Sequence, residues 1–144
     1  MVTEAELDAL DSLARGAVGL TATSLAVGDR ADLTLVQWRA LAVLAEGRGE
    51  PMRVGEVAGR LSMSLPSASR LARRLERHGL ATSERDEQDR RVTLLRVTHA
   101  GLELRDTVVR HRREVMARLL RDRHLPKDLE GGLVAIAAAF DGLD

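Results

Sequence analysis

Aromatic side chains are almost absent from this chain, and their absence restricts how a core can be built. Trp38 and Phe140 are the only residues of the Trp, Phe and Tyr types. The core must therefore be packed mainly with Leu, Val and Ala, a composition that favours helices over a β-sandwich. A length of 144 residues and a hydrophobic fraction of 44% are typical of one folded unit. We expect one mainly α-helical domain.

The composition also excludes several kinds of chemistry. The chain has no Cys, which excludes disulfides, thiolate zinc sites, iron–sulfur clusters and thiol-based redox sensing. The four His residues, His78, His99, His111 and His124, lack the i, i+4 spacing that presents two metal ligands on one helix. The sequence contains neither a nucleophile elbow nor a Gly-rich phosphate loop. We expect no catalytic residues, no metal and no cofactor, and hence a protein that is not an enzyme.

No segment of the sequence is typical of a membrane anchor. The longest apolar run, residues 133–140, is far shorter than the ~20 residues that cross a bilayer. The N-terminus is acidic, unlike that of a signal peptide. We therefore expect a cytoplasmic protein without a membrane partner.

Opposite charges are separated along the chain, although the formal net charge is zero. Residues 1–33 carry six acidic and two basic residues, a net charge of −4. Residues 60–96 carry nine Arg and five acidic residues, a net charge of +4. Because phosphate contacts depend on charges within about a Debye length, a basic segment in a neutral chain is typical of a binding face on a larger scaffold.

Apolar residues recur at spacings of three and four along most of the chain, as in amphipathic helices. Gly28-Asp29-Arg30 should end the first helix, and Thr34 is a favourable N-cap for the second, with Gln37 at the capping-box position. Ser62-Met63-Ser64 separates two short helices, which together predict a helix-turn-helix that ends at Gly79. The predicted helices span residues 4–27, 35–47, 54–61, 65–79, 99–123 and 126–143.

A β-hairpin is predicted directly after the helix-turn-helix. Residues 92–97 are rich in β-branched side chains, and residues 80–85 are a weaker strand candidate. Residues 86–91 between them are entirely polar. We expect two antiparallel strands with a protruding tip.

The predicted helix over residues 65–79 has two chemically different faces. Ala68, Leu71, Ala72 and Leu75 fall in one sector, at about 100° per residue. An exposed stripe of Arg and hydroxyl side chains can enter the major groove of DNA, where Arg binds guanine and both residue types bind phosphates. The alternative is a solvated charged face. The opposite sector holds Pro66, Ser69, Arg70, Arg73 and Arg77, with Ser67 and Arg74 at its edges.

The hairpin tip offers a second cationic group. The guanidinium of Arg91 could reach a narrow, A·T-rich minor groove, where the negative potential is enhanced. Asp89, two residues earlier, could hold that side chain with a charge-assisted pair. The alternative is a charged turn that contributes only to solubility.

The terminal helices present more apolar surface than a monomer of this size readily buries. In the last helix, Leu129, Leu133, Ile136, Phe140 and Leu143 follow a heptad-like spacing, although Gly131-Gly132 weakens the helix. Packing against a second copy would cover this seam. The alternative is that the two terminal helices pack on each other within one chain.

The order of these elements, and two segments in particular, resemble the MarR family of winged helix-turn-helix transcriptional regulators. Residues 85–101, from Arg85 through the Asp-x-Arg tip to Gly101, resemble the wing signature of that family and the Thr-x-x-Gly start of the following helix. Residues 69–80 resemble its recognition helix and exit. The resemblance covers nearly the whole length.

The resemblance implies a mainly α (α+β) fold in which a winged helix-turn-helix lies between N- and C-terminal dimerisation helices. Residues 1–33 would form the N-terminal dimerisation helix and residues 99–144 the long helix and C-terminal dimerisation helix. Residues 34–98 would bind DNA, with the recognition helix at 65–79 and the wing at 81–98. A homodimer would bind a pseudo-palindromic site with half-sites about 10 base pairs apart.

The resemblance also implies which residues meet double-stranded DNA. In the wing these are Asp89, Arg90 and Arg91, with Arg91 in the minor groove and Asp89 orienting it. The sequence departs from the family pattern at Arg53, where a hydroxyl residue commonly caps the third helix, so that cap is missing. The implied recognition-helix residues are Ser64, Pro66, Ser67, Ser69, Arg70, Arg73, Arg74 and Arg77.

Many relatives release DNA when a phenolic or anionic small molecule binds beside the dimerisation helices. The corresponding residues here would be Trp38, which could stack on a ring, and Arg39, which could pair with a carboxylate. Trp38 could equally be a core anchor. We therefore predict a ligand-responsive repressor that binds DNA as a homodimer. The alternative function is a winged-helix protein–protein interaction module without specific DNA binding.

Overall fold

The structure, a computed structural model, describes residues 2–26 and 33–141, except for the side chains of Phe140 and Asp141. The expected helix end at residues 28–30 and the seam position Leu143 lie outside the described residues. The elements, in chain order, are α1 (Glu4–Leu25), α2 (Leu35–Glu46), β1 (Met52–Arg53), α3 (Val54–Arg60), α4 (Leu65–Arg77), β2 (Ala81–Arg85), β3 (Thr93–Val97), α5 (His99–Leu120) and α6 (Leu129–Asp141).

The mainly helical prediction is confirmed, and local capping chemistry explains where several helices begin. The backbone N–H of Gln37 donates to the Thr34 hydroxyl over 3.3 Å, and the Thr34 N–H donates to the Gln37 side chain over 2.7 Å. This is the predicted capping box of α2. Thr3 and Glu6 form an unpredicted second one at α1, where hydrogen bonds from the Thr3 backbone and then its side chain lower the pKa of Glu6.

The last two helices are shorter than predicted. The long helix α5 ends at Leu120 instead of residue 123, and α6 starts at Leu129 instead of at Pro126. The Leu129 N–H donates to the Pro126 carbonyl over 3.2 Å in the turn before α6. The described part of the chain has no helix with an apolar stretch that could span a bilayer.

The sheet has three strands, one more than the predicted hairpin. The strand order is β1-β3-β2, and both pairings are antiparallel. The hairpin pairs Ala81 with Val97 and Arg85 with Thr93, as expected for strands joined by a tip. The unpredicted strand β1 has only two residues, Met52 and Arg53, and such a short strand has no periodicity to detect.

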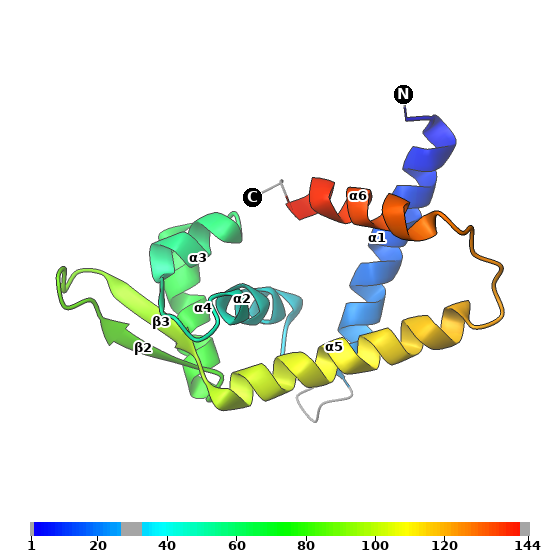
Figure 1. The fold of residues 1–144 in the computed structure, drawn as a ribbon. Helices are drawn as coiled ribbons and strands as arrows, with labels where there is room; N and C mark the ends of the chain where they lie inside the picture. Colours follow the sequence, from blue (N-terminus) through cyan, green and yellow to red (C-terminus); the bar gives the residue numbers. More distant parts are fainter. Residues whose placement is uncertain (1, 27–32, 142–144) are drawn as a thin grey trace.

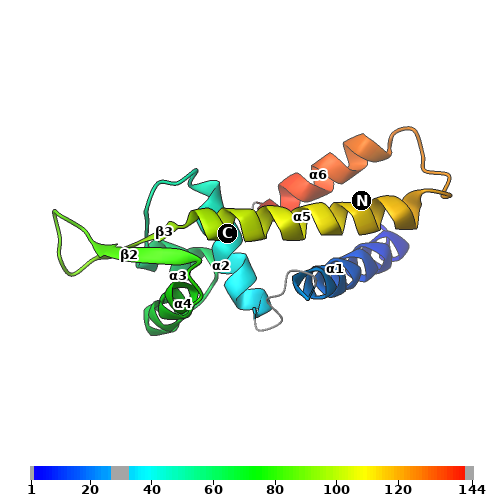
Figure 2. The same cartoon turned by 90° about the horizontal axis from the view of Figure 1, so that it is seen from below.

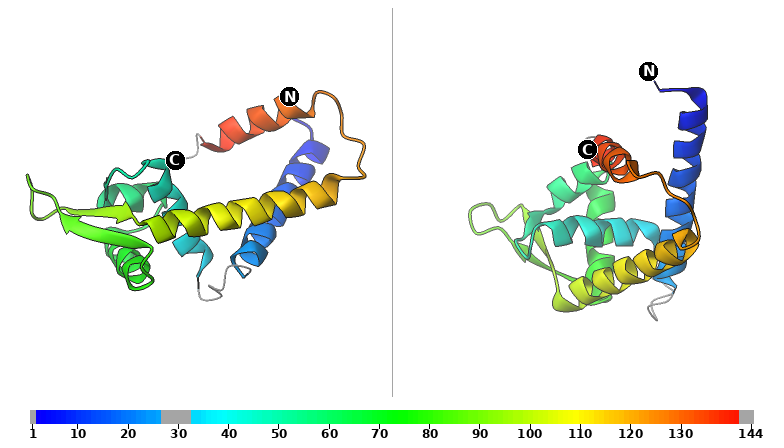
Figure 3. Two further views of the ribbon diagram at one scale, coloured as in Figure 1. Left: turned by 60° about the horizontal axis from the view of Figure 1, so that its bottom comes forward. Right: turned by 45° about the vertical axis from the view of Figure 1, so that its right-hand side comes forward.

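One apolar core holds α2, α3 and α4 against the sheet (Figure 1). Leu41 and Leu44 of α2, Leu75 of α4 and Leu95 of β3 are almost fully buried. Leu80, which links α4 to β2, is buried with them. The core therefore fixes the position of α4 relative to the wing, which projects at the end of the molecule farthest from α1 (Figure 3).

The long helix α5 connects this winged unit to the terminal helices (Figure 2). Its first half is buried at Leu104 and Val108, whereas Leu119 near its end is 66% exposed. At the α1–α5 contact, His111 Nδ1 lies 3.1 Å from the Ser24 hydroxyl, and Arg112 donates to the Thr21 hydroxyl over 3.4 Å. The winged unit thus has a closed core, while the far end of the molecule keeps apolar surface.

The start of α5 is a joint between three elements. The Thr98 hydroxyl caps α5 by accepting from the Gly101 N–H over 3.1 Å, and it donates to the Gly79 carbonyl over 2.7 Å at the end of α4. The Thr98 N–H donates to the Leu80 carbonyl over 3.0 Å. A Cβ at Gly101 would lie 2.4 Å from that same carbonyl oxygen. Only Gly therefore fits at position 101.

We predict that Gly101→Ala destabilises the protein by about 1–3 kcal/mol, because the added methyl group meets backbone that cannot move aside. The measurement is the free energy of unfolding from urea titration followed by circular dichroism. The matched control is Gly59→Ala in α3, where a Cβ meets no atom within 4 Å. The control should be neutral or about 0.5–1 kcal/mol more stable, and equal losses in both variants would contradict the prediction.

Candidate nucleic-acid interface

The predicted division of α4 into two faces is confirmed. Ala68, Leu71, Ala72 and Leu75 are all buried, with Leu75 at 0% exposure. The four Arg side chains of α4 are exposed on the outer side of the helix. Because nothing in the core competes for these guanidinium groups, they form a cationic ridge. We define the α4 ridge as Arg70, Arg73, Arg74 and Arg77.

A short chain of hydrogen bonds orders the start of α4. The Ser64 hydroxyl accepts from the Ser67 N–H over 3.4 Å, which is the predicted N-cap. It also donates to the Ser67 hydroxyl over 3.0 Å, and the Arg70 guanidinium donates to that hydroxyl over 3.0 Å. Pro66 lies in the first turn, where its missing N–H breaks no helical hydrogen bond. Arg70 is therefore restrained on the side of the ridge nearest the helix start.

A groove of about 790 Å³ separates α4 from the wing. Arg73 lines it from α4 and Arg91 from the wing, while Ser69 lies on its α4 wall. Glu56, Glu76 and Glu84 also line the groove, so its walls carry both signs of charge. The structure thus brings two of the predicted site regions, the ridge and the wing, to one concave surface.

Glu76 fixes the distance between the two sides of this groove, and sequence reasoning missed it. Its carboxylate accepts from the Ser83 N–H over 3.0 Å and from the Ser83 hydroxyl. This contact joins α4 to β2 across seven residues of sequence. A Glu among Arg residues on a helix has no local pattern that indicates such a partner, so only the fold reveals the contact.

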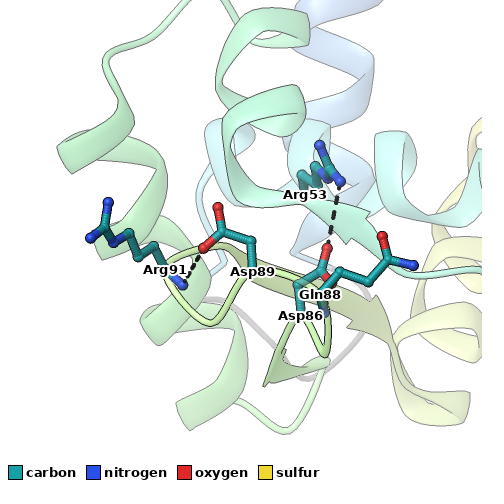
Figure 4. A network of polar contacts seen from close by, with 5 residues as sticks. All are labelled: Arg53, Asp86, Gln88, Asp89 and Arg91. Atoms are coloured by element: carbon teal, nitrogen blue, oxygen red, sulfur yellow. Dashed lines mark hydrogen bonds and ion pairs between the residues drawn. The ribbon is translucent and has the colours of Figure 1, made fainter.

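The wing tip is a tight turn built from two Asp residues. The Asp86 N–H donates to the Val92 carbonyl over 3.1 Å, and the Val92 N–H donates to the Asp89 carbonyl over 2.8 Å. The Asp89 carboxylate accepts from the backbone N–H of Arg91 over 3.0 Å (Figure 4). The predicted pairing of Asp89 with the Arg91 guanidinium is therefore wrong for this structure. Short Asp side chains prefer such a local turn contact, and the guanidinium points away from Asp89.

The missing side-chain cap at the start of α3 is confirmed, and the Arg that replaces it has another partner. Arg53 occupies the N-cap position and makes no side-chain capping hydrogen bond. Its guanidinium reaches the wing instead, where Nη2 lies 3.5 Å from Asp86 Oδ2 (Figure 4). Sequence reasoning identified the missing cap but not this ion pair.

The two predicted effector residues have different environments. Trp38 is 6% exposed and packs in the core, as the alternative interpretation of this residue holds. Arg39, the next residue on α2, is exposed. Within the described part of the chain, no group of three or more His, Asp or Glu side chains could hold a metal ion.

Comparisons with known proteins point to one family. The MarR family model matches residues 31–92. The structure of AbsC, a MarR family transcriptional regulator from Streptomyces coelicolor, is similar at 27% identity and a TM-score of 0.64, covering 99% of this chain and 98% of AbsC. RV1404 from Mycobacterium tuberculosis is similar at 25% identity and a TM-score of 0.77, covering 99% and 94% of the two chains. No curated protein matches.

A third similar structure is a variant of MepR from S. aureus bound to an oligodeoxyribonucleotide. It has 20% identity, a TM-score of 0.67 and full coverage of both chains, so it speaks for the fold alone. The arrangement of α3, α4 and the β2–β3 wing defines a winged helix-turn-helix protein. The resemblance to the MarR family of transcriptional regulators, which are not enzymes, is confirmed.

We predict that Glu76→Ala frees β2 from α4 and speeds amide exchange at Ser83 about fivefold. A hydrogen bond to a charged group contributes about 1.5–3 kcal/mol, and we take about 1 kcal/mol here because the carboxylate is partly exposed. The measurement is hydrogen exchange followed by NMR. Glu114→Ala, at an exposed position on α5, controls for the change in helix propensity. Unchanged exchange at Ser83 in both variants would show that Glu76 does not hold the strand.

Proposed function

We propose that this chain is a transcriptional regulator that binds double-stranded DNA as a homodimer at a pseudo-palindromic operator. The observation that carries the proposal is the exposure of the α4 ridge on the same groove that Arg91 of the wing lines. A helix and a hairpin with cationic tips at one surface match the two grooves of duplex DNA. In this proposal residues 34–98 bind DNA, and residues 1–33 and 99–144 hold two copies together.

In the proposed complex, α4 lies in the major groove. Ser64, Pro66, Ser67 and Ser69 face bases or phosphates at the start of the helix, beside Arg70. The contact between Arg70 and the Ser67 hydroxyl supports this role, because a restrained guanidinium loses less rotamer freedom on binding. Arg73, Arg74 and Arg77 meet the phosphate backbone farther along the ridge.

The wing would reach the neighbouring minor groove. Arg91 enters it, and Arg90 contacts the flanking phosphates. Asp89 orients Arg91 through the backbone of the turn, since its carboxylate accepts from the Arg91 N–H. The exposure of all three side chains supports this role.

A homodimer would form through the terminal helices. Leu7 and Leu13 of α1, Leu119 of α5 and Leu133 of α6 are all about half exposed or more, at 55%, 60%, 66% and 48%. A groove of about 670 Å³ with largely apolar residues lies between α1 and α6. Burial of such a surface against a second copy is the usual way to remove it from water.

We also propose that the regulator is a cytoplasmic repressor released by a phenolic or anionic effector. The site would lie near Trp38 and Arg39, with Arg39 available to pair with a carboxylate. Stacking on Trp38 requires the core around it to open, because only 6% of that residue is exposed. Trp38 is the only Trp, so its fluorescence reports effector binding directly.

The alternative function is a protein–protein interaction module in which the α4 ridge binds an acidic partner. Salt dependence separates the two functions. With about four to five phosphate contacts per protomer, a plot of log K against log salt concentration for duplex DNA should have a slope of about −6 to −9. Fluorescence anisotropy with labelled duplex measures it. A flat response, or no preference for any genomic duplex over random DNA, would favour the protein partner.

Two variants distinguish the proposed contacts. Arg91→Ala should weaken binding most at sites flanked by A·T pairs, because the minor groove is narrow there. Arg73→Ala should weaken binding to all sequences alike and make the salt slope shallower by about 1, because one phosphate loses its cationic partner. Affinities for a set of duplexes that differ only in their flanks provide the measurement. Arg113→Ala, exposed on α5, is the control, and the same decrease in affinity for all three variants would contradict these roles.

A further inference from the structure

We infer that Arg53 and Asp86 form a positioning pair that sets where the wing meets DNA. The inference rests on the proposed function and adds to it two residues that neither the sequence resemblance nor the comparisons assign. Arg53 precedes α3 and Asp86 begins the wing tip, so the pair joins the helix-turn-helix to the hairpin (Figure 4). Neither residue needs to touch DNA to affect binding.

Asp86 is the anchor of the wing tip. Among residues 86–91 it is the only side chain that is not exposed, with 14% of its side-chain surface accessible. One carboxylate oxygen accepts from the Gln88 N–H over 2.9 Å, and the other lies 3.5 Å from the Arg53 guanidinium. Its own N–H closes the tip by donating to the Val92 carbonyl. Asp86 thus connects the turn that carries Arg91 to one side chain outside the hairpin.

Arg53 is held on firm backbone. It pairs with Leu94 as the last residue of β1, and its neighbour Val54 is the first residue of α3 and is 4% exposed. The side chain of Arg53 is 62% exposed and lines the same groove as Arg73 and Arg91. A guanidinium on rigid backbone can therefore fix the tip relative to α4.

The geometry makes a prediction with a definite sign. If Asp86 acted only through its charge, removing that charge beside a polyanion would strengthen DNA binding. If Asp86 positions the wing, removing the charge releases the tip and weakens binding, because the entropy cost of ordering the tip then falls on the binding step. Glu87 is the matched control, since it is the next residue, carries the same charge and is exposed.

We expect Asp86→Asn to weaken binding to an A·T-flanked operator about three- to tenfold, an effect of the size seen when one ion pair and its ordering are removed. Glu87→Gln should leave binding equal or slightly stronger. Arg91→Ala should cost less affinity in the Asp86→Asn background than in the unaltered chain, because a released tip already uses Arg91 poorly. Stronger binding in both Asp86→Asn and Glu87→Gln would overturn the inference.

Arg53 is tested by a double-mutant cycle. Arg53→Gln alone should match Asp86→Asn, and the two together should be no worse than either alone. Additive effects, with a salt slope lowered by about 1 in Arg53→Gln only, would show that Arg53 binds phosphate directly and does not act through Asp86. The charge-reversed pair Arg53→Glu with Asp86→Arg should recover part of the affinity.

A measurement without DNA separates this inference from the proposed function. If the pair holds the tip, amide exchange at Gln88 and Val92 should be about three- to tenfold faster in Arg53→Gln and unchanged in Glu87→Gln. Failure of the unaltered chain to bind any duplex would refute the proposed function, and unchanged exchange in Arg53→Gln would refute the positioning pair.

Discussion

The rest of the structure depends on the close approach of three chain segments at the start of α5. The end of α4, the end of β3 and the first turn of α5 meet around the Thr98 hydroxyl, which joins Gly79 to Gly101. Gly101 leaves space for the Leu80 carbonyl where any other side chain would collide with it. This joint fixes the direction of α4 relative to α5, and so decides where the α4 ridge points in a pair of chains.

The charges of the winged unit are arranged with the same economy. The ridge is cationic only on the outer side of α4, because its inner side is committed to the core by Ala68, Leu71, Ala72 and Leu75. Acidic side chains near the groove serve as structural acceptors: Glu76 holds β2 and Asp86 holds Arg53. Carboxylates occupied by donors repel a polyanion less than free ones would, which is how a chain of zero net charge can still present a basic face.

Sequence predicts the features of this fold that depend on neighbours in the chain. The capping box at Thr34, the apolar face of α4 and the paired strands of the wing all follow from spacings of two to four residues. The ion pair of Arg53 with Asp86 and the contact of Glu76 with Ser83 depend on segments brought together by folding, so no local pattern indicates them. The predicted orientation of Asp89 is wrong, because its choice between a backbone and a side-chain donor is set by the turn geometry.

The uninterrupted length of α5 has a mechanical consequence. Its 22 residues form a rod of about 33 Å, with the α4 joint at one end and the exposed apolar side chains Met116, Leu119 and Leu120 at the other. A tilt of about 5° at the far end would displace the joint by about 3 Å over that length. Such a lever needs no unfolding: a change in packing between the terminal helices too small to alter any element would already shift each reading head by nearly one base-pair step.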